Sequence, residues 1–181
     1  MDNRVITLID TPRGEISLRQ ARVEDASAFH ALRLEALQDS PTAFSADYEV
    51  NAARPESYFE ERLRELGEGG TIYFAWNGEE LLGMCGLHRG ESPKTQHSAL
   101  IWGVYVKLGW RGLRIAGALI EACIAWGRAH GVKVVKLGVS TNNEAALRCY
   151  KRCGFKVYGR EPQAIFYEGV MYDEFLMMRP I

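Results

Sequence analysis

The chain has 181 residues, of which 22 are basic and 23 acidic, and its net charge at pH 7 is -1. This near-neutral balance indicates neither a nucleic-acid-binding protein nor a membrane-surface protein, and no run of eighteen apolar residues is present to span a membrane. A chain of this length buries about 70% of the surface that its unfolded form exposes. We therefore expect one domain over residues 1–181, with a sizeable core.

The four cysteines, Cys85, Cys123, Cys149 and Cys153, contain no CxxC pair. Cys149 and Cys153 are four residues apart and would share one face of a helix, but the neighbouring sequence supplies no further metal ligands. We therefore expect ordinary thiols and no metal site. The opening MDNRVITLID has no uninterrupted apolar stretch of signal-peptide length, which predicts a cytoplasmic location.

The first part of the chain predicts two strands and two helices. Residues Glu15–Arg19 alternate between apolar and polar side chains, as a strand does, and a turn at residues 11–14 pairs them with a strand at Val5–Ile9. A helical apolar stripe begins after Asp25 and is closed by Pro41. A second helix is expected over Pro55–Leu66, before a group of glycines.

The rest of the chain predicts an antiparallel meander and then alternating helices and strands. The expected strands are Ile72–Trp76, Leu81–His88, Ser98–Val106, Val132–Val139, Phe155–Tyr158 and Tyr172–Met178, and the expected helices are Ile115–Ala129 and Asn143–Arg152. This order predicts an α+β domain whose central sheet is mixed but mostly antiparallel and is flanked by helices on both faces.

The segment VYVKLGWRGLRIAGALIEA, residues 104–122, places a loop rich in Gly and Arg between a strand and an apolar helix. A helix start exposes unpaired N–H groups and a partial positive charge, so this loop can bind an anion. Gly112 and Gly117 would let a pyrophosphate approach closely, and Arg111 and Arg114 would add cationic contacts. A plain connection with surface arginines remains the alternative for this segment alone.

The segment STNNEAALRCYKRCGF, residues 140–155, carries a second pattern: Asn-x-x-Ala-x-x-x-Tyr-x-x-x-Gly-Phe, from Asn143 to Phe155. Asn143 begins the expected helix, where its side chain can cap the helix or contact a ligand. Tyr150 lies two turns later on the same face. Taken alone, this segment also fits an amphipathic helix with a packing tyrosine.

Together the two segments resemble the GNAT family of N-acetyltransferases. The family's loop signature is Arg or Gln, two residues, Gly, one residue, then Gly or Ala, and Arg111, Arg114 and Ala116 occupy those positions. Arg114 replaces the glycine, which implies either a changed loop path or an extra phosphate contact. The resemblance implies that acetyl-CoA is the acyl donor and that it binds at Val104, Tyr105, Val106, Arg111, Gly112, Leu113, Arg114, Ile115, Ala116, Gly117, Asn143, Ala146 and Tyr150.

The resemblance also implies that Tyr150 lies beside the thioester sulfur. A phenol with a pKa of about 10 is protonated at neutral pH and can donate to the leaving thiolate. The backbone N–H of Val104 or Tyr105 is our candidate donor to the acyl oxygen.

The sequence does not identify the group that removes the proton of the acceptor amine. Many relatives carry a Glu or His on the strand before the loop, but the alternate positions Ser98, Leu100 and Trp102 offer neither. We therefore expect proton loss through ordered water, with His97 or Glu35 as relays. Glu174 is a further candidate, although such a residue more often belongs to a solvated face.

The expected function is transfer of an acetyl group from acetyl-CoA to a primary amine of a small or amino-acid-like acceptor, by direct attack in a ternary complex. The alternatives are a non-catalytic acetyl-CoA-sensing module, acetylation of a protein amino group and, less favoured, a Cys149 nucleophile. Expected partners include no nucleic acid or membrane. A homodimer through an edge strand at Tyr172–Met178 is plausible. An oxidoreductase is excluded because no GxGxxG motif follows the first strand.

Overall fold

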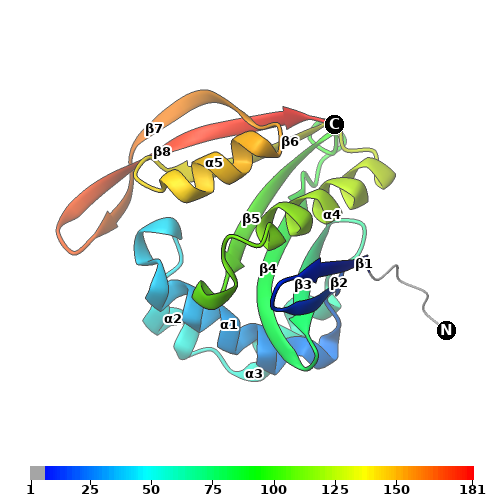
Figure 1. The fold of residues 1–181 in the computed structure, drawn as a ribbon. Helices are drawn as coiled ribbons and strands as arrows, with labels where there is room; N and C mark the ends of the chain where they lie inside the picture. Colours follow the sequence, from blue (N-terminus) through cyan, green and yellow to red (C-terminus); the bar gives the residue numbers. More distant parts are fainter. Residues whose placement is uncertain (1–6) are drawn as a thin grey trace.

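The structure, a computed structural model, describes residues 7–181, which form one eight-stranded sheet with helices against it (Figure 1). The strands are β1 (Thr7–Thr11), β2 (Gly14–Gln20), β3 (Gly70–Asn77), β4 (Glu80–Arg89), β5 (Ser98–Val106), β6 (Val134–Ser140), β7 (Lys156–Tyr167) and β8 (Val170–Pro180). Their order across the sheet is β1-β2-β3-β4-β5-β6-β8-β7. Val5 and Ile6, which the predicted first strand includes, lie outside the described residues.

Five α-helices are present in the described chain. They are α1 (Ala26–Asp39), α2 (Tyr48–Ala52), α3 (Glu56–Arg64), α4 (Ile115–Ala129) and α5 (Glu144–Arg152), and short 3-10 turns lie at Val23–Asp25, Pro41–Ala43 and Leu108–Trp110. All but α2 were predicted, and the bounds of α4 are those expected. The five-residue α2 is too short to show an apolar period, but Asp47 caps it by accepting a hydrogen bond from the Val50 N–H at 2.9 Å.

The sheet is mixed, as predicted. Among the described strands β5 and β6 form the parallel pair, and the other neighbours are antiparallel. The predicted meander is β3-β4-β5. The parallel connection from β5 to β6 passes through α4, as such a connection requires a crossover.

Helices cover both faces of the sheet, which confirms the predicted layers. On one face, Phe29 of α1 lies with its ring centre 5.5 Å from those of Phe59 in α3 and Phe74 in β3. On the other face, Leu119 and Ile120 of α4 are fully buried in a second core cluster. Because successive side chains of a strand point to opposite faces, one sheet supplies both clusters.

The parallel pair stays together over only three positions. Residues Ser98–Leu100 of β5 pair with Val134–Lys136 of β6, and beyond them the two strands are no longer paired. In the part of β5 beyond Leu100, the pairing with β4 is also irregular. Gly103 in this part has a left-handed φ of 64°, which favours glycine. The outer half of β5 therefore has one edge without a strand partner in the described sheet.

The C-terminal hairpin differs from the prediction. Strand β7 runs to Tyr167 rather than Tyr158, and β8 lies between β6 and β7 instead of at the edge. The prediction that Tyr172–Met178 is an edge strand is therefore wrong, because alternation in a sequence does not show how many neighbours a strand has. The homodimer remains a prediction without this argument.

Candidate active site

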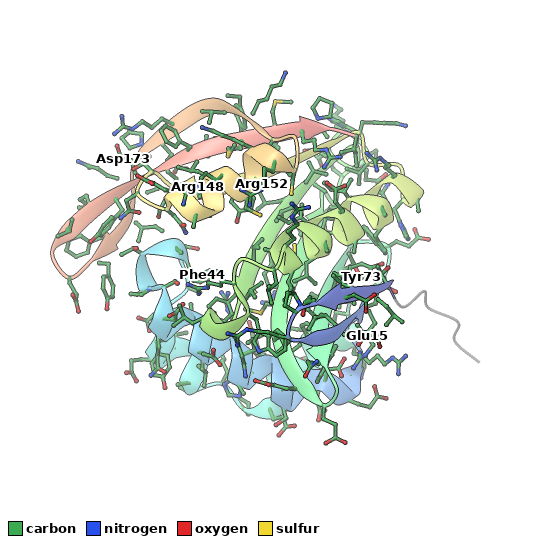
Figure 2. The ribbon with its side chains drawn as sticks, viewed as in Figure 1. Glu15, Phe44, Tyr73, Arg148, Arg152 and Asp173 are labelled. Carbon is green, nitrogen blue, oxygen red and sulfur yellow. The ribbon has the colours of Figure 1, made fainter. Side chains whose placement is uncertain are left out.

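A cleft of about 1080 Å³ opens where β5 and β6 diverge. Its walls are the outer half of β5, the loop and first turn of α4, helix α5 with parts of β6 and β8, and the segment that joins α1 to α2. Figure 2 shows Arg148 and Arg152 of α5 on one side of the opening and Phe44 of the α1–α2 segment on the other. The cleft thus joins segments that are far apart in the sequence.

The loop before α4 enters the helix through a left-handed residue. Arg114, at the N-cap, has φ 63° and ψ 10°, and it stands where the loop signature has glycine. Glycine adopts this conformation freely, whereas a residue with a Cβ atom does so at a cost of about 1 kcal/mol. The substitution therefore requires no change of loop path.

The first turn of α4 presents backbone amides to the cleft. The Ala118 N–H donates to the Arg114 carbonyl at 3.1 Å, so the N–H groups of Ile115, Ala116 and Gly117 precede the hydrogen-bonded ladder of the helix. These three residues line the cleft. A Cβ atom on Gly117 would lie 3.7 Å from Cys153 Sγ, an ordinary contact, so the turn is not crowded. The amides and the helix dipole together favour an anion here.

Arg111 is exposed but is paired within the chain. Its Nε donates to the Val106 carbonyl at 2.9 Å, its Nη2 donates to the Asp39 carboxylate at the end of α1, and its guanidinium lies 5.4 Å from the centre of the Tyr105 ring. These contacts tie α1 to the loop. Arg111 thus holds the loop against α1, and both Arg111 and Arg114 are exposed and line the cleft.

Helix α5 brings the residues of the second motif to the cleft. Asn143 caps the helix, because its Oδ1 accepts a hydrogen bond from the Ala146 N–H at 3.1 Å. Tyr150 is buried, with 7% of its surface exposed, yet it lines the cleft. Burial, and then the charges of nearby thiols and of Glu174, raise the pKa of the Tyr150 phenol. Its hydroxyl therefore keeps its proton at neutral pH.

A carboxylate enters the cleft from β8. Glu174 is half-buried and lines the cleft together with Tyr150 and with Gly138 of β6. A Cβ atom on Gly138 would lie only 2.6 Å from Glu174 Oε2, so the carboxylate occupies space that the glycine leaves free. Burial, and then the neighbouring Glu161 carboxylate, raise the pKa of the Glu174 carboxyl above its usual range. A carboxylate of raised pKa in a cleft is suited to accepting a proton.

Residues 33–155 match the Acetyltransferase (GNAT) family, and this match spans most of the chain and both motifs. The chain belongs to this family. The predicted resemblance is therefore confirmed, and it agrees with the predicted enzyme class, an acetyl-CoA-dependent acyltransferase.

Two relatives illustrate the range of this GNAT family. The chain is 30% identical to a mycothiol acetyltransferase of Brachybacterium faecium over 142 residues, which are 77% of the chain and 40% of that relative. It is 27% identical to an L-methionine sulfoximine/L-methionine sulfone acetyltransferase of Pseudomonas paraeruginosa over 148 residues, which are 81% of the chain and 84% of that relative. The chain thus spans less than half the length of the first relative and most of the second.

The fold also matches solved GNAT structures. A GNAT-family acetyltransferase of Streptococcus pneumoniae superposes with a TM-score of 0.83 at 20% identity, over 92% of this chain and 99% of that one. The predicted fold class is confirmed by this likeness.

Most of the predicted acetyl-CoA-binding residues line one cleft. They are Val104, Tyr105, Val106, Arg111, Gly112, Arg114, Ile115, Ala116, Gly117, Asn143, Ala146 and Tyr150. Leu113 does not line it, because its side chain packs against the core cluster beneath α4. A contact from Leu113 to a cofactor would therefore have to come from its backbone.

The two predicted proton relays do not line the cleft. His97 lies at the start of β5, where its carbonyl accepts the Lys133 N–H at 2.7 Å, and the paired residues Ser98–Leu100 separate it from the diverging part of the strand. Glu35 of α1 accepts a hydrogen bond from the Tyr105 hydroxyl at 3.1 Å. His97 therefore lies away from the cleft, and Glu35 reaches it only indirectly, through its contact with the cleft residue Tyr105.

The cleft also contains two thiols, Cys149 and Cys153. A hydrogen bond from Cys153, together with the charge of Arg152, lowers the pKa of the Cys149 thiol to about 7 even though burial opposes this shift. Within residues 7–181, no group of three metal-ligating side chains is found and no helix is long and apolar enough to cross a membrane.

Glu174 and Arg33 are among the cleft residues that the sequence analysis did not assign to the site. Glu174 was considered but placed on a solvated face, and Arg33 of α1 was not considered. Neither lies in a motif, and each reaches the cleft only because the sheet brings β8 beside β6 and α1 packs on the opposite face. The one available signal for Glu174 was the absence of a base on β5.

Proposed function

We propose that this protein transfers an acetyl group from acetyl-CoA to the primary amine of a small or amino-acid-like acceptor, by direct attack in a ternary complex. The observation that carries the proposal is the cleft itself, in which the amides at the start of α4, the unpaired edge of β5 and the buried Tyr150 face one space.

The residues present fit a pyrophosphate-bearing donor. The amides of Ile115, Ala116 and Gly117 would hold the pyrophosphate, with Arg114 beside them. The backbone of Val104–Val106, at the edge that β6 leaves, would pair with the amide-bearing arm of the cofactor as a strand would. When bound, acetyl-CoA supplies an activated acyl group and a thiol as its leaving group.

Two side chains of the cleft have opposite roles in moving protons. The Glu174 carboxylate would accept a proton from the acceptor amine, which must be neutral to attack although a lysine-like amine has a pKa of about 10.4. The Tyr150 hydroxyl stays protonated, so it would donate a hydrogen bond to the leaving sulfur. No covalent intermediate with the protein is needed.

A small acceptor is supported by a relative and by the charge of the chain. The Pseudomonas relative acts on L-methionine derivatives, and it is the one of the two relatives whose length the chain largely spans. The net charge of -1 gives no general attraction to charged macromolecules. Acetylation of a protein amino group is therefore the less favoured acceptor class.

Two features of the sequence favoured the sensing alternative: the absence of a base on β5, and Arg114 in place of the motif glycine. Glu174 supplies a carboxylate to the same cleft from β8, which removes that reason. The strained Arg114 was the other reason, and its conformation preserves the loop path. We therefore favour the enzyme over the sensor.

The proposal is tested by thiol release from acetyl-CoA with a panel of amino acids, polyamines, aminoglycosides and short peptides, beside calorimetric titration of acetyl-CoA. Release with amino acids or another small amine supports it. Release with peptides alone would move the acceptor to the protein class. Tight binding of acetyl-CoA without release from any acceptor would favour the sensor, and absence of binding would overturn the donor assignment.

A further inference from the structure

The acceptor side of the cleft contains an arginine, Arg33, with one nitrogen that has no hydrogen-bond partner. Arg33 of α1 lines the cleft, and its Nη1 is shielded from solvent but has no hydrogen-bond partner among residues 7–181. A cationic N–H group shielded from water without a partner is costly, and structures normally pair it. Burial, and then the like charge of Arg62 in α3, lower the pKa of the Arg33 guanidinium, so the surroundings oppose its charge.

The neighbours of Arg33 are aromatic or basic. Its guanidinium carbon lies 5.2 Å from the ring centre of Phe44, and that of Arg62 lies 5.4 Å from the ring centre of Trp102, which also lines the cleft. Neither arginine forms an ion pair within the described chain, although six other arginines do. The positive charge here is therefore not neutralised by the protein's own carboxylates.

The unpartnered nitrogen of Arg33 lies beside Gly103 of β5, next to the part of the cleft where the acyl group is proposed to bind. A Cβ atom on Gly103 would lie 3.9 Å from Arg33 Nη1, so this nitrogen faces the irregular part of β5. The next residue is Val104, where the cofactor arm is proposed to run. A ligand held by Arg33 would thus lie near the acyl group. Figure 2 shows Phe44 on the segment that borders this part of the opening.

We propose that Arg33 binds the carboxylate of the acceptor, so that the acceptor is an amine that carries a carboxylate, as an amino acid does. A guanidinium binds a carboxylate through two parallel hydrogen bonds, which fixes the orientation of the ligand as well as its place. The aromatic rings of Phe44 and Trp102 would border the acceptor's apolar part. This inference rests on the proposed function and narrows it to one class of substrate.

The test compares amines that differ only in the carboxylate. We would measure kcat/KM with L-leucine and isoamylamine, and with L-phenylalanine and phenethylamine, for the wild type and Arg33→Met. The matched control is Arg64→Met on α3, where the exposed side chain pairs with Glu60. The wild type and the control should prefer the amino acid of at least one pair by about 30-fold or more, and Arg33→Met should lose this preference mainly through KM.

Binding and stability separate this inference from the proposed function and from misfolding. Calorimetry with N-acetyl-L-leucine and N-acetyl-L-phenylalanine should show binding to the wild type and about 30-fold weaker binding to Arg33→Met. The Tm of Arg33→Met should equal or exceed that of the wild type, because Met removes a half-buried charge that no carboxylate of the described chain pairs with.

Equal use of both members of each pair by the wild type, or an Arg33→Met variant that keeps the preference, would overturn the inference while the enzyme assignment stands. Failure of the wild type to acetylate any amine would instead contradict the proposed function.

Discussion

The two halves of the cleft are built in different ways. The proposed donor half consists of the edge of β5, the first turn of α4 and the face of α5, and its proposed binding groups are largely backbone amides within residues 104–150. The acceptor half consists of single side chains, Arg33, Phe44, Trp102 and Glu174, brought together from α1, the α1–α2 segment, β5 and β8. The donor half is therefore a local structure, and the acceptor half is a product of the tertiary fold.

This difference explains how a family keeps one donor and changes its acceptor. A backbone amide does not depend on its side chain, so Arg114 can replace glycine without removing an amide from the donor half. In the proposed acceptor half each side chain would itself make the contact. Substitutions should therefore change turnover and specificity in the acceptor half, and mainly stability in the donor loop.

The largest expected effect is at Glu174. Glu174→Gln should lower kcat by about 100-fold or more, because the amide cannot accept the proton, while acetyl-CoA affinity measured by calorimetry stays unchanged. In the wild type kcat should rise as pH increases through the raised pKa of Glu174. A variant with unchanged kcat would show that another group, or water, removes the proton.

The neighbouring Glu161 sharpens this test. Its negative charge raises the pKa of Glu174, so Glu161→Gln should lower that pKa and move the acidic limb of the pH–kcat profile to lower pH. Both proteins are measured with the same acceptor, so the titration of the amine itself cancels. A limb that does not move would separate Glu174 from the proton transfer.

A smaller effect is expected at Gly138. The Cβ atom of Gly138→Ala would lie 2.6 Å from Glu174 Oε2, and the flexible carboxylate should move aside. We expect kcat to fall by about 10-fold with little change in Tm, since misplacing a catalytic group slows the reaction more than it unfolds the protein. Gly69→Ala is the control, because nothing lies within 4 Å of its added Cβ atom. Equal kcat in the two variants would contradict the placement of Glu174.

In the donor loop the expected effect is on stability. Arg114→Gly should raise the free energy of unfolding by about 1 kcal/mol, because glycine adopts the left-handed conformation without strain, and Arg114→Ala should not. Denaturant titration measures both. An Arg114→Gly variant no more stable than the wild type would contradict the strain, and the loss of acetyl-CoA affinity in both variants measures the proposed contact of the Arg114 side chain.

The smallest effect on turnover is expected at Cys149. Cys149→Ser should retain kcat, because the proposed attack is direct, although the thiol with a pKa of about 7 should react readily with iodoacetamide. Acetyl-CoA should slow this alkylation, since Cys149 lines the cleft. Loss of turnover in Cys149→Ser would reopen the covalent alternative.

The sequence predicted the donor half because its signals are local. The change from strand to helical period around Gly109, and the spacing from Asn143 to Phe155, both describe single strand–loop–helix units whose geometry follows from neighbouring residues. Family resemblance then assigned the ligand. The hydrogen bond from Arg111 to Asp39 was not foreseen, because Asp39 lies in a different element, and the proposed phosphate contact of Arg111 stays a prediction.

The two charged side chains of the acceptor half, Glu174 and Arg33, could not be predicted in this way. Glu174 reaches the cleft because β8 inserts between β6 and β7, which the alternation of β8 does not reveal. His97 was chosen because it is near the β5 segment in sequence, and Glu35 because it carries a carboxylate. Neither property shows where a side chain points in the fold. Arg33 could not be identified as a site residue from the sequence, because arginines are common on amphipathic helices. Only the structure shows that its Nη1 has no hydrogen-bond partner.

The central claim is that Tyr150 serves the reaction and not merely the packing of α5. The most direct test is Tyr150→Phe, assayed for thiol release and for acetyl-CoA affinity by calorimetry, with Tyr158→Phe on the exposed part of β7 as the matched control. We predict that Tyr150→Phe lowers kcat by about 100-fold with little change in affinity, and that the control retains both. Full turnover in Tyr150→Phe would contradict the account.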